Sequence, residues 1–221
     1  MAPGKEELFQ MVYTGIQPTR KKAIEAKDIR QLERWVKKEE LRKKVFPEPL
    51  VSSVYYFLFC FYARGMSYVD MAYLKKSDIR NGVLRYRRKK TGQYLEIRII
   101  RELQEIIDFF SSRVVDSPYL FPIIHRKNKS GRLQYESGLR LQNKRLKEIS
   151  REAGLDYPLS THVARHTWAT IAKKEHIPLS VISEGLGHTS PKTTAIYLAS
   201  FDNNTLDQAN VKVIKAIKRA G

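Results

Sequence analysis

Two blocks near the C-terminus combine residue types that could act together on an anionic substrate. The first block, THVARHTWAT, places His162 and Arg165 three residues apart, so on a helix they share one face. The second block, SEGLGHTSPKTTAIYL, presents His188 after a Gly-x-Gly turn and carries Tyr197 nine residues later. Arginine binds anionic oxygens through paired hydrogen bonds, histidine transfers protons, and tyrosine is a nucleophile once deprotonated. Taken singly, each block has an ordinary structural explanation as part of a helical core.

In combination, HxxRHT followed by LGHxSxxTTxxY resembles the signature of the tyrosine recombinases, the phage integrase family. The blocks agree with that family in order, spacing and flanking residues, and the resemblance covers roughly residues 20–205. It implies an enzyme that cuts and rejoins DNA. A tyrosine attacks a backbone phosphodiester, forms a 3′-phosphotyrosine link and releases a 5′-hydroxyl, which later attacks to rejoin a strand. The link conserves bond energy, so ATP is not needed. The sequence has no CxxC pair or HExxH that would support a metal site, and no cofactor is expected.

By this resemblance, Tyr197 is the nucleophile and Arg165 is one of two arginines that bind the phosphate. His188 donates to a non-bridging oxygen, and His162 assists with the tyrosine proton or the phosphate. His166 has a supporting role and orients its neighbours. These residue types suit the reaction, because arginine remains charged at any working pH and stabilises charge that grows on phosphate oxygens.

The leaving 5′-oxygen needs a proton, which the family takes from a lysine in a strand hairpin. The family pattern is Lys before Thr-Gly, so the turn RRKKTGQ assigns this role to Lys90. Lys89 is the neighbour that could be confused with it. We expect Arg87, Arg88 and Lys89 to bind DNA.

The second arginine is where the chain departs from the family pattern. The family has G-L-R-x-x-E, whereas this chain has GMSYVD, with Ser67 at the arginine position and Asp70 at the supporting acidic position. Three explanations stand: Arg64 fills the role from three residues upstream, another basic residue does so with the hairpin as the richest source, or the site is inactive. Three residues span at most about 10–11 Å, which a long arginine side chain could cover, so we favour Arg64. Ser67 also suits a helix N-cap, and Arg64 suits a helix C-terminus.

The composition indicates a globular protein with a polyanionic partner. The chain has 221 residues, of which 42% are apolar, and 41 Lys and Arg against 23 Asp and Glu give a net charge of +18. The longest apolar stretch, 50–63, is too short to span a bilayer, which favours nucleic acid over membrane. The single cysteine, Cys60, cannot form an internal disulfide, and its apolar neighbours predict a buried thiol. A cytoplasmic protein fits these features.

The elements that must position the site are predicted to be mainly α-helical with one small three-stranded antiparallel sheet, the fold of a tyrosine recombinase catalytic domain. Turns at Asn81-Gly82 and Thr91-Gly92 divide the strands. The helix after PEP is apolar nearly all round, which predicts that it is central. The helices are expected at about 28–44, 50–64, 67–76, 102–111, 138–153, 161–175, 179–186, 191–199 and 205–219.

Three segments are expected along the chain. Residues 1–20 are a linker or an added tail, 21–202 form the catalytic domain, and 203–221 form a C-terminal helix. That helix is either exchanged between protomers or packed on its own domain. The N-terminal DNA-binding domain that family members usually carry is not expected within this chain.

The expected partners are double-stranded DNA and further copies of the chain, forming a tetramer on two DNA sites and a monomer without DNA. The leading function is a site-specific recombinase, with an integrase of a mobile element favoured over a host enzyme. Two alternatives remain open: an activity like that of type IB topoisomerases, and a DNA-binding relative whose catalysis is impaired.

Overall fold

The computed structural model describes residues 23–42, 48–126 and 128–198, together with positions 210, 211, 214 and 215. Residues 21–198 form one compact unit, apart from the two ends of the chain. The larger unit contains every residue predicted for the site. The predicted N-terminal tail, most of the predicted C-terminal helix and its exchange between protomers fall outside the described residues.

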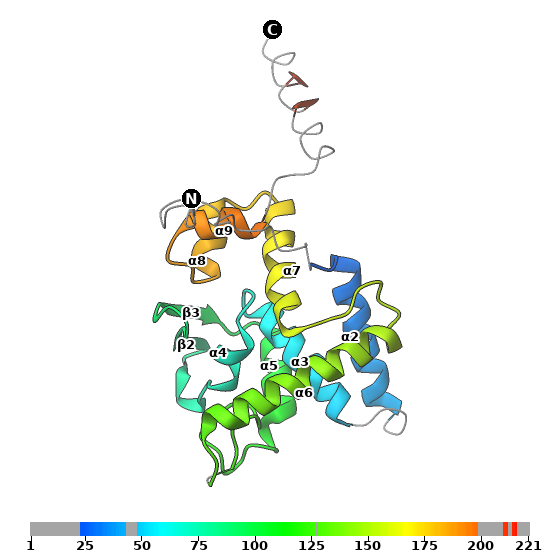
Figure 1. Cartoon of the computed structure of the whole chain (residues 1–221), viewed down its shortest axis with the longest axis vertical. Coiled ribbons are helices and arrows are strands. Elements are labelled where there is room, and N and C mark those ends of the chain that lie inside the picture. The colour runs from blue at the N-terminus through cyan, green and yellow to red at the C-terminus, as the bar shows by residue number, and fades with distance from the viewer. Residues whose placement is uncertain (1–22, 43–47, 127, 199–209, 212–213, 216–221) are drawn as a thin grey trace, which may run out of the picture. The chain divides into compact units, whose positions relative to one another are not determined.

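Helix α3 (Glu48–Tyr62) is the centre of the larger unit (Figure 1). It packs against α2 (Ala26–Arg42), α5 (Arg101–Ser111), α6 (Gly131–Glu152) and α7 (Thr161–Lys174). A helix with neighbours on so many sides needs apolar residues nearly all round, which is the pattern of this segment. The prediction of a central helix here is confirmed.

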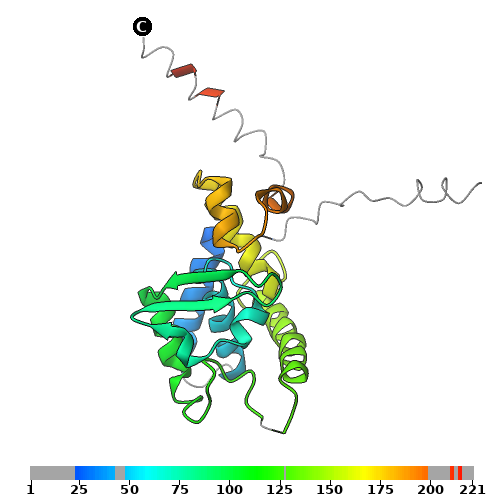
Figure 2. The ribbon, with the colours of Figure 1, turned by 90° about the vertical axis from the view of Figure 1, so that its left-hand side faces the viewer.

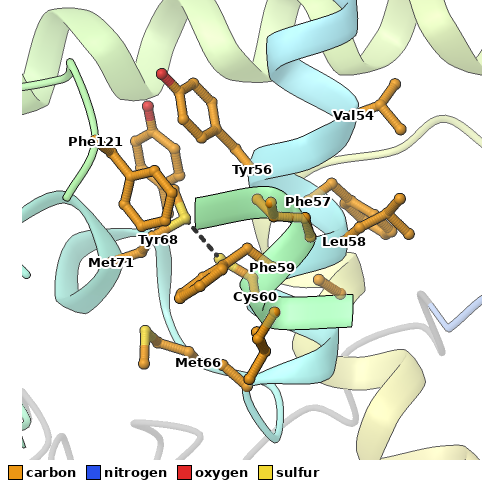
Figure 3. Packing of buried hydrophobic residues seen from close by; sticks show 14 of the residues in the cluster. Val54, Tyr56, Phe57, Leu58, Phe59, Cys60, Met66, Tyr68, Met71 and Phe121 are labelled. Carbon is orange, nitrogen blue, oxygen red and sulfur yellow. Dashed lines mark hydrogen bonds between the residues drawn. The ribbon is translucent and has the colours of Figure 1, made fainter. Parts of the chain in front are cut away.

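Aromatic side chains dominate the core around α3 (Figure 3). Phe59 and Phe121 are both fully buried, and their ring centroids lie 4.7 Å apart in an edge-to-face arrangement. Tyr56 stacks on Phe110 with centroids 4.8 Å apart. Cys60 is buried as predicted, and burial raises the pKa of its thiol. This rigid core fixes the direction in which the chain leaves α3 and enters the site.

The predicted three-stranded antiparallel sheet is present, with strand order β1-β2-β3 (Figure 2). Its strands are β1 (Ile79–Arg80), β2 (Val83–Arg87) and β3 (Tyr94–Arg98). Leu84 of β2 pairs with Ile97 of β3, and both are buried. The next pair along the strands, Arg85 and Glu96, lies on the opposite face. The sheet thus has an apolar inner face and a charged outer face.

Two helices begin at other residues than the sequence predicts. Helix α2 begins at Ala26, so Asp28 lies in its first turn rather than at the N-cap; its carboxylate accepts a hydrogen bond of 2.8 Å from the Glu25 N–H. Helix α6 begins at Gly131 rather than 138. The buried Gln134 amide there binds backbone groups of the preceding loop, and this tertiary contact supports a first turn that carries no apolar pattern.

Three short helices complete the part that carries the site: α4 (Tyr68–Ala72), α8 (Leu179–Gly185) and α9 (Pro191–Leu198). Helices α7, α8 and α9 share a second, smaller apolar cluster. Helix α4 is shorter than the predicted 67–76, because the backbone after it pairs with residues 118–120: the Leu120 N–H donates to the Leu74 carbonyl at 2.9 Å, and the Lys76 N–H donates to that of Pro118 at 2.8 Å. Within the described residues, no helix is both long and apolar enough to cross a membrane.

Candidate active site

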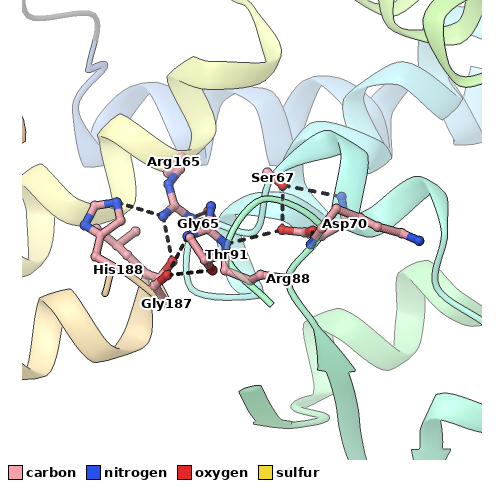
Figure 4. A network of polar contacts seen from close by, with 10 residues as sticks. Gly65, Ser67, Asp70, Arg88, Thr91, Arg165, Gly187 and His188 are labelled. Atoms are coloured by element: carbon pink, nitrogen blue, oxygen red, sulfur yellow. Dashed lines mark hydrogen bonds and ion pairs between the residues drawn. The ribbon is translucent and has the colours of Figure 1, made fainter. Parts of the chain in front are cut away.

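Arg165 is a buried cation on α7 whose guanidinium reaches two other segments (Figure 4). Its Nη1 donates to the Gly65 carbonyl oxygen at 2.7 Å and its Nη2 to that of Leu186 at 2.6 Å. Nη2 also lies 3.1 Å from Nε2 of His188. Arg165 therefore joins the end of α3 to the turn between α8 and α9, and the predicted pair Arg165 and His188 is in contact.

The chain turns sharply where α3 ends, directly against Arg165. Gly65 has φ +68°, and a Cβ there would lie 3.1 Å from the Arg165 Cα, so both the backbone conformation and the close approach favour glycine. Arg64 precedes it with φ +56°, an unusual value for a residue with a side chain. The side chain of Arg64 is exposed, and no contact described in the structure places it against Arg165.

His188 follows this turn and is held through both ring nitrogens. Nδ1 lies 2.7 Å from the Thr194 hydroxyl, and Nε2 faces the Arg165 guanidinium. Since a guanidinium only donates, Nε2 is the acceptor, and we place the ring proton on Nδ1, which donates to Thr194. Burial, followed by the charges of Arg165, Arg88 and Lys90, lowers the pKa of His188 to about 4. His188 is therefore neutral at pH 7.

The hairpin between β2 and β3 brings two lysines to the site in different ways. The Lys89 N–H donates to Asp70 Oδ1 at 2.7 Å, and its ammonium lies 4.3 Å from the centre of the Tyr73 ring. The charge of Lys90 contributes to the lowered pKa of His188, so this exposed side chain lies within electrostatic reach of the imidazole. Lys89 is thus engaged by Asp70 and Tyr73, whereas the charge of Lys90 is among those that lower the pKa of His188.

Ser67 is the N-cap of α4, as the sequence predicted. Its hydroxyl accepts from the Asp70 N–H at 3.3 Å and donates to Asp70 Oδ2 at 2.6 Å. Asp70 is buried and pairs with the guanidinium of Arg88, whose Nε lies 3.5 Å from Oδ2. The position that carries an arginine in the family pattern is therefore occupied by a neutral cap, and the neighbouring acid is paired with the hairpin.

Arg88 is the residue whose environment differs most from the sequence prediction. It was expected to bind DNA beside the exposed Arg87, yet only 6% of Arg88 is exposed and its Nη1 donates to the Gly187 carbonyl oxygen at 2.6 Å. The signal that could have found it is the alternation of the strand, because Arg88 continues the buried face of Leu84 and Tyr86.

The remaining predicted residues lie on α7 and α9. His162 is exposed in the first turn of α7, and His166 follows Arg165 on the same helix, partly buried. The backbone of Tyr197 belongs to α9, the helix that also carries Thr194. Among the described residues, no group of three or more His, Cys, Asp and Glu is placed to hold a metal ion.

Residues 22–204 match the sequence pattern of the Phage integrase family. The chain belongs to this family. Among curated relatives, the tyrosine recombinase XerA of Pyrococcus furiosus is 30% identical over 195 residues, which cover 87% of this chain and 62% of XerA. XerD of Pseudomonas putida is 43% identical over 53 residues, or 24% of this chain and 18% of XerD. The chain thus spans less than two thirds of the length of these integrase-family relatives.

Solved structures of integrase-family members share the fold, and the predicted fold class is confirmed. The match to the crystal structure of XerA recombinase covers 86% of this chain and 64% of the XerA chain, with a TM-score of 0.59 at 17% sequence identity. The match to the post-cleavage complex of XerH with a palindromic difH substrate covers 86% of this chain and 52% of the XerH chain, with a TM-score of 0.63 at 18% sequence identity. A lambda integrase dimer bound to a COC′ core site matches 85% and 51%, with a TM-score of 0.56 at 18% identity.

Proposed function

We propose that this chain is the catalytic domain of a site-specific DNA recombinase that cuts and rejoins strands through a 3′-phosphotyrosine intermediate. The observation that carries the proposal is the contact between Arg165 and His188 at 3.1 Å. It joins the two predicted catalytic blocks at the turn that leads into α9, the helix of Tyr197. Membership of the phage integrase family gives this arrangement its chemical context.

The positive charge around His188 suits a scissile phosphodiester. Arg165 offers guanidinium donors to the non-bridging oxygens, and a neutral His188 adds a hydrogen bond when Nε2 carries its proton. A phosphate oxygen beside Nε2 can only accept a hydrogen bond, so DNA binding favours the tautomer that carries its proton on Nε2. The Thr194 hydroxyl can donate as well as accept, and therefore supports either tautomer.

In the proposed reaction, Tyr197 loses its proton and its oxygen bonds to phosphorus as the bond between phosphorus and the 5′-oxygen breaks. Lys90 gives a proton to the leaving 5′-oxygen, and its charge, which is among those that lower the pKa of His188, supports a place near the site. His162 lies one turn before Arg165 on α7 and is assigned to the tyrosine proton. Rejoining is the same sequence in reverse, with a 5′-hydroxyl as the nucleophile.

The proposed partner is double-stranded DNA, bound by the charged hairpin, including Arg87 and Lys89, and favoured by the net charge of +18. The similar structures include XerH bound to its difH substrate and a lambda integrase tetramer bound to a Holliday junction. By analogy we propose a tetramer on two DNA sites. We also keep the expectations of a cytoplasmic location and a mobile-element origin.

Covalent capture tests the function on DNA of every sequence at once, so the target site need not be chosen in advance. The protein is incubated with random-sequence duplexes lightly nicked by DNase I, and protein–DNA complexes that survive SDS are isolated and sequenced. We expect adducts enriched in one sequence with wild type and none with Tyr197→Phe, which removes only the nucleophilic oxygen. Nuclease digestion of the adduct should leave a nucleotide linked through its 3′-phosphate.

The two alternative functions, topoisomerase-like activity and DNA binding without catalysis, predict different results with the same protein. Relaxation of supercoiled plasmid, with adducts at many unrelated sequences, would favour an activity like that of type IB topoisomerases. Salt-dependent DNA binding without any adduct would contradict the recombinase proposal and favour a relative with impaired catalysis.

A further inference from the structure

The recombinase proposal leaves one electrostatic requirement open. Charge grows on the phosphate oxygens during strand cleavage, and side-chain cations on more than one side of them stabilise it best. Arg165 is one such cation. Ser67, at the position of the second arginine in the family pattern, is neutral, and both functions of its hydroxyl are used by Asp70.

Arg88 brings a second buried guanidinium to the same turn as Arg165 (Figure 4). Its Nη1 binds the carbonyl of Gly187, and Nη2 of Arg165 binds the carbonyl of Leu186, each at 2.6 Å. The two arginines therefore meet consecutive peptide groups immediately before His188. The charges of both also act on the His188 imidazole. Arg88 thus lies where a phosphate bound to Arg165 and His188 would meet it.

The surroundings of Arg88 hold it in place but leave part of its donor capacity unused. Asp70 supplies the opposite charge at 3.5 Å, a separation too long for a direct hydrogen bond to Nε. Nε is buried and has no hydrogen-bond partner among the described residues. Among the described residues, the one hydrogen bond of the Arg88 side chain goes from Nη1 to the Gly187 carbonyl, so the terminal nitrogens keep further N–H groups for an anionic ligand.

The backbone fits Arg88 closely as well. Gly187 has φ +62°, and a Cβ there would lie 2.5 Å from the Arg88 Cδ, so glycine at this position admits the arginine stem. By contrast, Arg64 is exposed, and its side chain has no described contact with the turn. Burial, the carbonyl contact and the reach to His188 therefore favour Arg88 over Arg64.

We propose that Arg88 is the second phosphate-binding arginine of the site, a catalytic residue supplied by the hairpin, and that Asp70 is its positioning residue. This inference rests on the recombinase proposal. Arg88 and Arg165 then bind the non-bridging oxygens of the scissile phosphate from the hairpin and α7, and Ser67 takes no part in binding it.

The test compares rates of adduct formation on one nicked duplex, chosen from the sequences that wild type captures. We expect Arg88→Gln to form adduct about 10²–10³-fold more slowly, the loss typical of one removed transition-state donor. Arg132→Gln is the matched control, since it removes the same charge from an exposed ion pair with Glu136 on α6, and its rate should stay at the wild-type level.

A methylphosphonate at the scissile position separates a phosphate-binding role from a structural one. Its methyl group removes the negative charge that Arg88 is proposed to bind, while the tyrosine oxygen can still bond to phosphorus as the 5′-oxygen leaves. On this duplex, most of the deficit of Arg88→Gln relative to wild type should disappear. Arg88→Lys, which keeps a cation, should lie between Arg88→Gln and wild type on the natural phosphate.

Three results would overturn the inference. They are a wild-type rate for folded Arg88→Gln, a deficit that is equally large on methylphosphonate, and transfer of the whole pattern to Arg64→Gln. If Arg88→Gln fails to fold, the double variant Asp70→Asn/Arg88→Met removes the buried pair together, and its rescue by methylphosphonate is judged in the same way. Absence of adducts with wild type would instead contradict the recombinase proposal itself.

Discussion

The buried pair of Asp70 and Arg88 should make a large contribution to stability that is separable from any DNA chemistry. Their side chains are 1% and 6% exposed, and the closest charged atoms lie 3.5 Å apart. At an effective dielectric constant of about 20, two unit charges at this distance attract by about 5 kcal/mol. Asp70→Asn removes this attraction, but its remaining amide oxygen can still accept from the Lys89 N–H. We therefore expect a loss of about 3–5 kcal/mol, the usual result of leaving one buried charge unpaired.

Urea unfolding at pH 7, followed by the fluorescence of Trp35 and Trp168, measures this loss. A domain of this size should lose about 2–4 °C in Tm for each kcal/mol, so the variant should melt about 6–20 °C lower. Glu105→Gln is the control, because it makes the same change in an exposed pair with Arg101 and should cost less than about 0.5 kcal/mol.

A double-mutant cycle decides whether the pair is the cause. Adding Arg88→Met to Asp70→Asn removes the unpaired charge and should restore at least about 2 kcal/mol of the loss. A loss below about 1 kcal/mol for Asp70→Asn alone, or single effects that simply add in the double variant, would refute the reasoning.

Three further predictions concern the turn before α9. Thr194→Val should lower the free energy of unfolding, measured in urea, by about 0.5–1.5 kcal/mol, because the part-buried Nδ1–H of His188 loses its acceptor. Thr194→Ser should restore the wild-type value, and an unchanged value for Thr194→Val would contradict this reasoning. Gly187→Ala should lower the free energy of unfolding by at least about 1–2 kcal/mol from the positive φ alone, and should slow adduct formation because the new Cβ displaces Arg88. A variant as stable and as active as wild type would be evidence against both expectations. Between pH 6.5 and about 4, the unfolded chain binds a proton at His188 that the folded chain does not, so the free energy of unfolding should fall as the pH drops through this window. His188→Gln should reduce this dependence on pH in unfolding measured at several pH values, and an unaltered dependence would rule the explanation out.

Local chemistry in the sequence was sufficient to predict several elements of the site. The cap at Ser67 follows from a hydroxyl with an acid three residues later, and the hairpin between β2 and β3 follows from the turn residues Thr91-Gly92. The proximity of Arg165 and His188 was expected only through the resemblance to the integrase family, since nothing in either block alone indicates that they meet. The structure adds that Arg165 reaches this position by binding two backbone carbonyls.

Tertiary contacts decided the features that the sequence did not show. Arg88 stands in a run of four basic residues; strand alternation indicates the face it occupies, but not its partners Asp70 and Gly187, which are distant in sequence. The start of α6 likewise depends on Gln134, whose amide binds a loop that no helical period could reveal. The roles of Lys90 and Tyr197 stay predictions, while for the second arginine the burial of Arg88 and the exposure of Arg64 favour Arg88.

The two carbonyls at the turn before α9 couple phosphate binding to the position of that helix. Arg165 holds the carbonyl of Leu186 and Arg88 that of Gly187, in the segment that leads directly into the helix of Tyr197. A phosphate that draws on the same guanidinium groups alters how firmly this segment is held. Occupation of the phosphate site and the position of α9 are then linked equilibria, and each must shift the other by the same free energy. A ligand that mimics phosphate should thus change amide hydrogen exchange in α9, even when it never touches that helix.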